Sequence, residues 1–143
     1  MSVVTGIGRI NHIGIVTPSI EDSVRLYREI LGATVAHEPF DMPEIGVRIC
    51  FIDVPNSQIE LIEPLGNGSP VDEYLAANPT GGQHHVCFEV PDIQDAVADL
   101  AAKGVEILFE PRIGAHGTPI TFIDPKSMGG VLVELMETPR TSH

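Results

Sequence analysis

Basic residues are scarce in this chain. Eight Lys and Arg stand against twenty Asp and Glu, which gives a formal net charge of −12 at pH 7. An acidic surface of this kind repels phosphate backbones, so we expect no nucleic-acid partner. The same charge opposes an anionic substrate unless a metal ion and a few local cations, such as Arg112 and Lys126, reverse the potential inside a pocket.

The sequence also lacks a long apolar run and a cysteine pair with metal-binding spacing. No stretch approaches the roughly 18 apolar residues of a membrane span, and Met1 to Arg9 contain no basic segment followed by an apolar one. We therefore expect a cytoplasmic protein without a membrane partner. Cys50 and Cys87 lie inside apolar stretches, which favours two buried free thiols.

An internal repeat runs through the chain. Residues 10–63 align with residues 83–137, and the alignment pairs His12 with His85 and Glu60 with Glu134. The step from His to Glu is 60 − 12 = 48 residues in the first copy and 134 − 85 = 49 in the second. Each half, at about 60 residues, is too small to bury a sufficient core alone. We therefore expect residues 1–143 to form one domain made of two modules, at about 8–64 and 82–138.

The residue pattern predicts the order strand, helix and three strands in each copy. In the first copy the strands are expected at 10–17, 34–37, 47–53 and 58–62, with a helix from Ser19 to a stop at Gly32. In the second copy they are expected at 84–90, 105–109, 119–123 and 131–136, with a helix from Ile93 to a stop at Gly104. The segment 64–82, rich in Gly and Pro, is a linker with a short helical turn at 71–77. The predicted fold class is α+β, with two tandem βαβββ modules forming a curved mixed sheet.

Alternation along the strands predicts where the repeated His and Glu side chains point. Glu60 and Glu134 each lie between two apolar residues, and the two histidines alternate with apolar residues that follow them, such as Ile13 and Val86. Each of the four side chains therefore leaves its strand on the face opposite the apolar one. Such residues are commonly solvated side chains on an exposed strand face. Their recurrence in both copies favours a different interpretation, in which the two sheets curve around a concave site and His12, Glu60, His85 and Glu134 bind one divalent ion. Two imidazoles and two carboxylates suit Mn, Fe, Co, Ni or Zn.

These residues resemble those of a known family. The βαβββ repeat with His, Glu, His and Glu is similar to the vicinal oxygen chelate superfamily, which includes glyoxalases, bleomycin-resistance proteins and dioxygenases. Two segments of the second copy, Ile113-Gly114-Ala115-His116-Gly117 and Pro125-Lys126 followed by Gly129 to Leu135, resemble the methylmalonyl-CoA epimerase family within it. The resemblance covers almost the whole chain.

The resemblance implies a metal-dependent epimerase that acts on a small-molecule acyl-CoA substrate and forms a homodimer. Removal of the C2 proton, which lies between a thioester and a carboxylate, gives an enediolate that a divalent ion can stabilise. Glu134 is implied as both metal ligand and proton-transfer group. The second carboxylate is expected at Glu44, although one family member places it where this chain has Arg48 and Ile49.

Three further residues are candidates for substrate binding. Gly114 and His116 lie in a loop built for close backbone approach to a ligand, and Lys126 is a candidate to bind the substrate carboxylate or a phosphate of CoA. A simple turn explains His116 equally well, and solvent exposure explains Lys126 at least as well.

Two alternatives to this epimerase stay open. A glyoxalase-type isomerase, or another acyl-thioester epimerase of the superfamily, would use the same four ligands. A resistance-type protein would bind a small molecule without metal or catalysis, but the presence of all four ligand residues argues against it.

Overall fold

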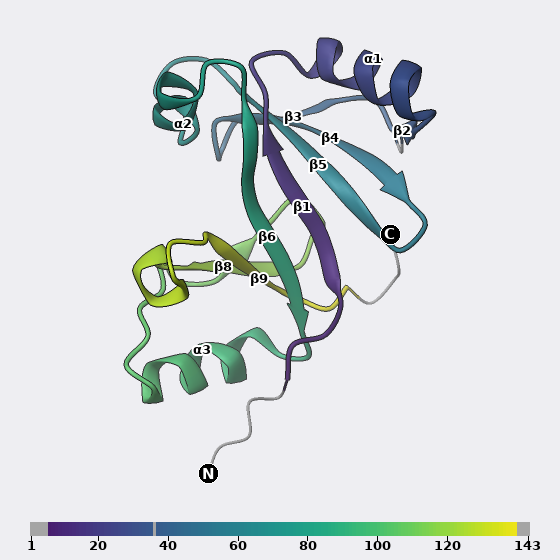
Figure 1. Ribbon diagram of the computed structural model, residues 1–143. Helices are drawn as coiled ribbons and strands as arrows, with labels where there is room; N and C mark the ends of the chain where they lie inside the picture. Colours follow the sequence, from purple (N-terminus) through teal and green to yellow (C-terminus); the bar gives the residue numbers. More distant parts are fainter. Residues whose placement is uncertain (1–5, 36, 140–143) are drawn as a thin grey trace. The chain divides into compact units, whose positions relative to one another are not determined.

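The computed structural model describes residues 6–35 and 37–139 and divides the chain into two compact units. The first unit runs from His12 to His84, and the second contains the N-terminal residues up to Asn11 together with the chain from His85 onward. Each unit holds a mixed sheet with a helix on one face, as the ribbon in Figure 1 shows. The predicted α+β class with two tandem modules is confirmed.

The first unit contains most of β1 and four further strands. The elements are β1 (Ile10–Val16), α1 (Ile20–Leu31), β2 (Thr34–Val35), β3 (Phe40–Met42), β4 (Val47–Val54), β5 (Ser57–Pro64) and α2 (Asp72–Ala77). The strand order is β2-β4-β5-β1, and β3 pairs with β4. β1 runs parallel to β5, whereas β5 is antiparallel to β4.

The second unit repeats this plan. Its elements are most of β6 (Gly82–Val90), α3 (Ile93–Ala102), β7 (Arg112–Ile113), β8 (Pro119–Ile123), a 3-10 turn η1 (Pro125–Met128) and β9 (Val133–Glu137). The strand order is β6-β9-β8-β7, with β6 parallel to β9 and the other pairs antiparallel. In both units the first and last strands of the module are therefore parallel neighbours.

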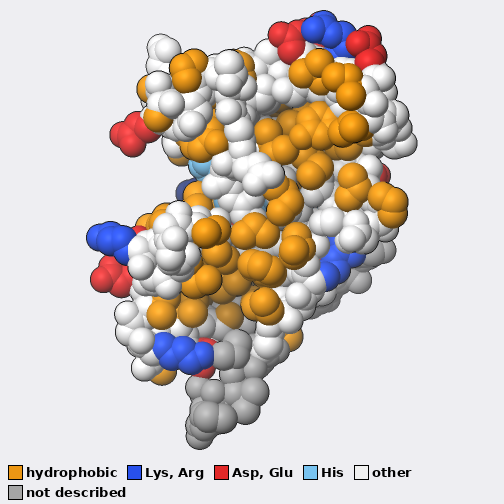
Figure 2. Space-filling model, viewed as in Figure 1, with side chains coloured by type: hydrophobic (Ala, Val, Ile, Leu, Met, Phe, Trp, Pro, Cys, Tyr) orange, Lys and Arg blue, Asp and Glu red, His pale blue; other side chains and the backbone are white. Residues whose placement is uncertain are grey.

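Helix α1 begins and ends where the sequence predicts. The Ser19 hydroxyl accepts a hydrogen bond from the Asp22 amide at 3.1 Å, and Gly32 ends the helix with a φ of 66°, a left-handed conformation that glycine adopts without strain. Ile20 packs with Cys50, Ile52 and Leu61 in one core cluster. Figure 2 shows charged side chains along the outer side of this helix and apolar ones beneath it. Burial of this apolar face, more than helix propensity, holds α1 on the sheet.

One predicted strand is wrong. Residues 105–109 follow β8 through hydrogen bonds from the Leu108 amide to the Phe122 carbonyl and from the Asp124 amide to the Glu106 carbonyl, but only an isolated bridge forms, at Ile107. The Thr121 hydroxyl donates to the Phe109 carbonyl at 2.6 Å. At Phe109 the carbonyl thus accepts from a side chain, a local alternative to a ladder hydrogen bond. The strand beside β8 is instead the short β7, and β3 is a further strand that the pattern did not predict.

Each module closes with a glutamate that holds its helix in place. Glu63 Oε1 accepts a hydrogen bond from the Ile20 amide at 2.7 Å, and Glu137 Oε1 accepts one from the Ile93 amide at 3.1 Å. These amides belong to the first residues of α1 and α3, where no helical carbonyl is available. A carboxylate at this end also interacts favourably with the helix dipole.

Both cysteines are buried and free, as predicted. Burial raises the pKa of the Cys50 thiol, so this side chain stays protonated at neutral pH. Among the described residues, no helix is both long enough and apolar enough to cross a membrane.

Replacing Glu63 by Ala is expected to lower the free energy of unfolding by about 1 kcal/mol, because the Ile20 amide loses its protein acceptor. Urea denaturation followed by circular dichroism measures the change. Glu106→Ala removes the same charge at an exposed position and should leave the midpoint unchanged. Equal losses in the two variants would mean that the negative charge, and not the bond to Ile20, is what stabilises the fold.

Candidate functional site

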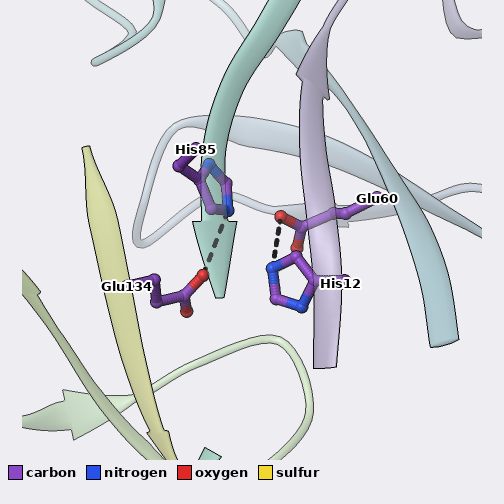
Figure 3. A group of neighbouring side chains, drawn as sticks. All are labelled: His12, Glu60, His85 and Glu134. Carbon is purple, nitrogen blue, oxygen red and sulfur yellow. Dashed lines mark ion pairs between the residues drawn. The ribbon is translucent and has the colours of Figure 1, made fainter. Parts of the chain in front are cut away.

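In the first unit, His12 and Glu60 form a buried ion pair. Gly14 is the register partner of Glu60 on the parallel strands β1 and β5, so His12, two residues before Gly14, shares the face of Glu60. Ile15 and Leu61 point the other way and pack toward α1. His12 Nε2 lies 3.4 Å from Glu60 Oε1, as drawn in Figure 3. The side chains leave the sheet on the face opposite the helix, as predicted.

The second unit contains the matching pair, His85 and Glu134. Cys87 is the register partner of Glu134 on β6 and β9, which places His85 and Glu134 on one face. Val133 and Leu135 point the other way and pack in the core cluster beneath α3. His85 Nε2 lies 3.0 Å from Glu134 Oε1 (Figure 3).

The burial of these residues contradicts their interpretation as solvated side chains. His12 is 1% exposed, Glu60 6%, and His85 and Glu134 7% each. Charged groups are rarely buried to this degree unless they are paired or bind a metal. Imidazoles and carboxylates are donors that suit a divalent first-row ion.

Each pair is flanked by a phenylalanine that the sequence did not single out. Phe51 is the register partner of Glu60, and its ring lies edge-on to that of His12, with the centroids 6.2 Å apart. Phe122 is the register partner of Glu134 and meets His85 in the same way at 5.3 Å. These rings restrict the imidazole orientations and keep water away from the pairs. The two phenylalanines become neighbours of the pairs only because β4 pairs with β5 and β8 pairs with β9, which the sequence alone does not show.

The segment with the predicted substrate-binding residues forms a tight turn between β7 and β8. The Gly114 amide donates to the Thr118 carbonyl, and the Gly117 amide donates to the Gly114 carbonyl, both at 3.0 Å. A Cβ on Gly114 would lie 2.9 Å from Ile120 Cγ1, so this position has no room for a side chain. His116 is half-buried in the turn.

Lys126 lies in the first turn of η1. Its side chain is exposed, and its amide donates to Asp124 Oδ1 at 2.9 Å. The Lys126 ammonium group is therefore available to solvent, as the sequence analysis allowed.

The predicted second carboxylate lies in an exposed turn. Glu44 is in the connection between β3 and β4, and β4 then needs four residues from Val47 to reach Phe51, the partner of Glu60. At about 3.3 Å per residue, the turn lies roughly 13 Å along the strand from the His12–Glu60 pair. Position 49 shares the face of Phe51 and is nearer to the His12–Glu60 pair, but in this chain it is an isoleucine and supplies no carboxylate.

A separate cavity of about 900 Å³ lies in the first unit beside α1. It is lined by Arg25, Arg28, Cys50 and Glu63 among others. Cys50 and Glu63 belong to the helix-facing side of β4 and β5, so this cavity is on the face opposite His12 and Glu60. The His and Glu donor atoms lie at the buried pairs and not in this cavity.

Comparisons with known proteins show the family of the chain. Residues 11–122 match the model of the Glyoxalase/Bleomycin resistance protein/Dioxygenase superfamily. A mitochondrial methylmalonyl-CoA epimerase of Dictyostelium discoideum is 49% identical over 133 residues, covering 92% of this chain and 80% of that protein. An ethylmalonyl-CoA/methylmalonyl-CoA epimerase of Cereibacter sphaeroides is 49% identical over 131 residues, covering 90% and 97%.

A solved structure gives the same result for the fold. A variant of Streptomyces coelicolor methylmalonyl-CoA epimerase in complex with 2-nitronate-propionyl-CoA superposes with a TM-score of 0.86 at 36% identity. The match covers 96% of this chain and 99% of that one. The chain belongs to the Glyoxalase/Bleomycin resistance protein/Dioxygenase superfamily.

Proposed function

We propose that this protein is a metal-dependent epimerase that interconverts the C2 epimers of methylmalonyl-CoA. The observation that carries the proposal is the buried His–Glu pair found once in each unit at matching places in the repeat. Relatives that are 49% identical and named methylmalonyl-CoA epimerases support the substrate. Together they favour proton transfer at a carbon next to a thioester.

The four side chains His12, Glu60, His85 and Glu134 would hold the ion, which we expect to be Co, Mn, Ni, Zn or Fe. When bound, a divalent ion supplies Lewis-acid stabilisation of the negative charge that develops as the C2 proton leaves. Phe51 and Phe122 would exclude water from this charge, which strengthens every electrostatic interaction inside the site.

We assign proton transfer on one face of the substrate to the Glu134 carboxylate. His85 Nε2 holds Oε1 of this carboxylate at 3.0 Å, which fixes its orientation on the rigid strand β9.

Inversion at C2 also needs a proton-transfer group on the opposite face. Glu44 stays our proposal for this group, and it would act only if the exposed turn between β3 and β4 folds toward the bound substrate.

A second substrate deserves to be tested beside methylmalonyl-CoA. The Cereibacter sphaeroides relative is named for ethylmalonyl-CoA as well. The reacting carbon is the same in both thioesters, so the proposed chemistry does not distinguish them. We propose methylmalonyl-CoA as the main substrate, because both curated relatives carry it in their names.

We also propose that the protein is a homodimer. Leu26, Ile30 and Leu31 of α1 are 50%, 72% and 69% exposed, an apolar surface that a second copy could cover. Sedimentation equilibrium is expected to give the mass of two chains, and a monomer at micromolar concentration would contradict this proposal.

Protein purified without chelators is expected to contain about one divalent ion per chain, measured by inductively coupled plasma mass spectrometry. His12→Ala and His85→Ala should each lose most of the metal, because each removes one of four ligands. His37→Ala, at an exposed position outside the pairs, is the matched control and should keep it. If both ligand variants contained as much metal as the wild type, the proposed metal site would be wrong.

The wild-type enzyme is expected to exchange the C2 proton of methylmalonyl-CoA in deuterated water, followed by NMR. Glu134→Gln should slow the exchange by about 100-fold or more, because the amide cannot accept the proton. Its metal content and unfolding midpoint should be compared with those of the wild type, so that loss of the base is separated from loss of the site.

Glu44→Gln distinguishes the two interpretations of the exposed turn. If Glu44 is the opposing base, the variant should slow epimerisation to a degree similar to Glu134→Gln. Glu106→Gln, another exposed glutamate, is the control. Wild-type turnover in the Glu44 variant would mean that Glu44 is only a surface charge and that another residue is the second proton-transfer group.

A further inference from the structure

Arg112 leaves its strand on the face that carries the His85–Glu134 pair. Arg112 on β7 is the register partner of Ile120 on β8, and Ile120 is the partner of Met136 on β9. Partners in an antiparallel ladder point to the same face, and Met136 shares the face of Glu134, two residues earlier. The guanidinium therefore belongs to the face of the candidate site and not to the face covered by α3.

Aromatic rings connect Arg112 to the ion pair. The guanidinium carbon lies 4.4 Å from the centre of the Phe109 ring, a cation–π contact. Phe109 in turn lies 5.8 Å from Phe122, whose edge meets His85. Stacking on a ring fixes the plane of a guanidinium and leaves its N–H donors free to bind an anion.

The charge of Arg112 is not neutralised within the described chain. Several other cations face a carboxylate, namely Arg9, Arg25, Arg48 and Lys103. Arg112, by contrast, forms no ion pair within residues 6–35 and 37–139, and it is exposed. The chain has a net charge of −12, so an anionic substrate needs a local positive potential at the site. Arg112 supplies a positive charge with N–H donors on the face of the site.

The distance between Arg112 and the His85–Glu134 pair allows Arg112 to bind an oxyanion of the substrate, either on the reacting carbon or farther along the molecule. Two strands and two residues separate Arg112 from Glu134, which corresponds to about 12 Å between their Cα atoms at about 4.8 Å per strand and 3.3 Å per residue. An acyl-CoA that contains a free carboxylate carries oxyanions at both ends, in this carboxylate and in the CoA phosphates. Guanidinium groups recognise either kind of oxyanion through paired N–H donors.

We propose that Arg112, oriented by Phe109, binds an oxyanion of the acyl-CoA substrate and is a specificity-determining residue of this enzyme. The inference rests on the proposed function and extends it to the recognition of the substrate's charge. It assigns Arg112 to binding and not to proton transfer.

Steady-state kinetics of Arg112→Ala and Arg112→Lys test the inference. A charge-assisted hydrogen bond contributes enough that its loss is expected to raise KM about tenfold or more in the Ala variant, with little change in kcat. The Lys variant should recover part of the loss, because it keeps the charge without the planar fork. Lys103→Ala removes one positive charge elsewhere in the same unit and should leave KM unchanged.

Two thioesters separate the sources of the oxyanion. If Arg112 binds the carboxylate, KM should rise for both methylmalonyl-CoA and methylmalonyl-pantetheine, which lacks the phosphates. If Arg112 binds a phosphate, KM should rise for the CoA thioester alone. A KM within twofold of the wild type for both thioesters would overturn the inference.

Binding measured by isothermal titration calorimetry tests the inference without relying on turnover. Titrations of coenzyme A and of methylmalonate into the wild-type and Arg112→Ala proteins measure affinity directly. If the wild type shows no C2 exchange, the proposed epimerase is wrong, while weaker binding of either ligand to the variant would still support an oxyanion site at Arg112. Equal affinities in the two proteins would refute that site.

Discussion

A carboxylate shielded from water has to find a positive charge or a hydrogen-bond donor close by, and this requirement governs the structure. Glu60 and Glu134 are both almost fully buried, and an uncompensated charge there would cost several kcal/mol. Each stands beside a histidine on a parallel neighbouring strand, with a phenylalanine from the antiparallel neighbour closing the other side. The strand order of each module is what supplies both neighbours.

The last strand of each module serves the site and the helix at once. Glu60 and Glu63 are three residues apart, so they leave β5 on opposite faces, and Glu134 and Glu137 do the same on β9. One glutamate of each couple pairs with a histidine, and the other holds the first amide of the helix. The position of the buried carboxylate is therefore tied to the docking of the helix through one short, stiff segment.

Local signals predicted much of this fold. Ser19 and Gly32 marked the ends of α1, and alternation of apolar residues placed His12, Glu60, His85 and Glu134 on the faces away from the helices. Features that depend on which strands pair were out of reach. Phe51 and Phe122 become neighbours of the site only through cross-strand register, and Arg112 acquires its face only because β7 pairs with β8. The expected strand at 105–109 forms only an isolated bridge, and its Phe109 carbonyl accepts a hydrogen bond from a side chain, the Thr121 hydroxyl.

The division of the chain into units has a consequence for biosynthesis. Residues up to Asn11 are made first, yet they belong with the second unit, where the Gly8 amide donates to the Glu89 carbonyl and the Asn11 amide group donates to Glu89 Oε2. As the chain leaves the ribosome, this first segment has no Glu89 to bond with until β6 has been synthesised. Both residues of the first His–Glu pair have been synthesised long before Glu134, so the second pair can form only after nearly the whole chain has been made.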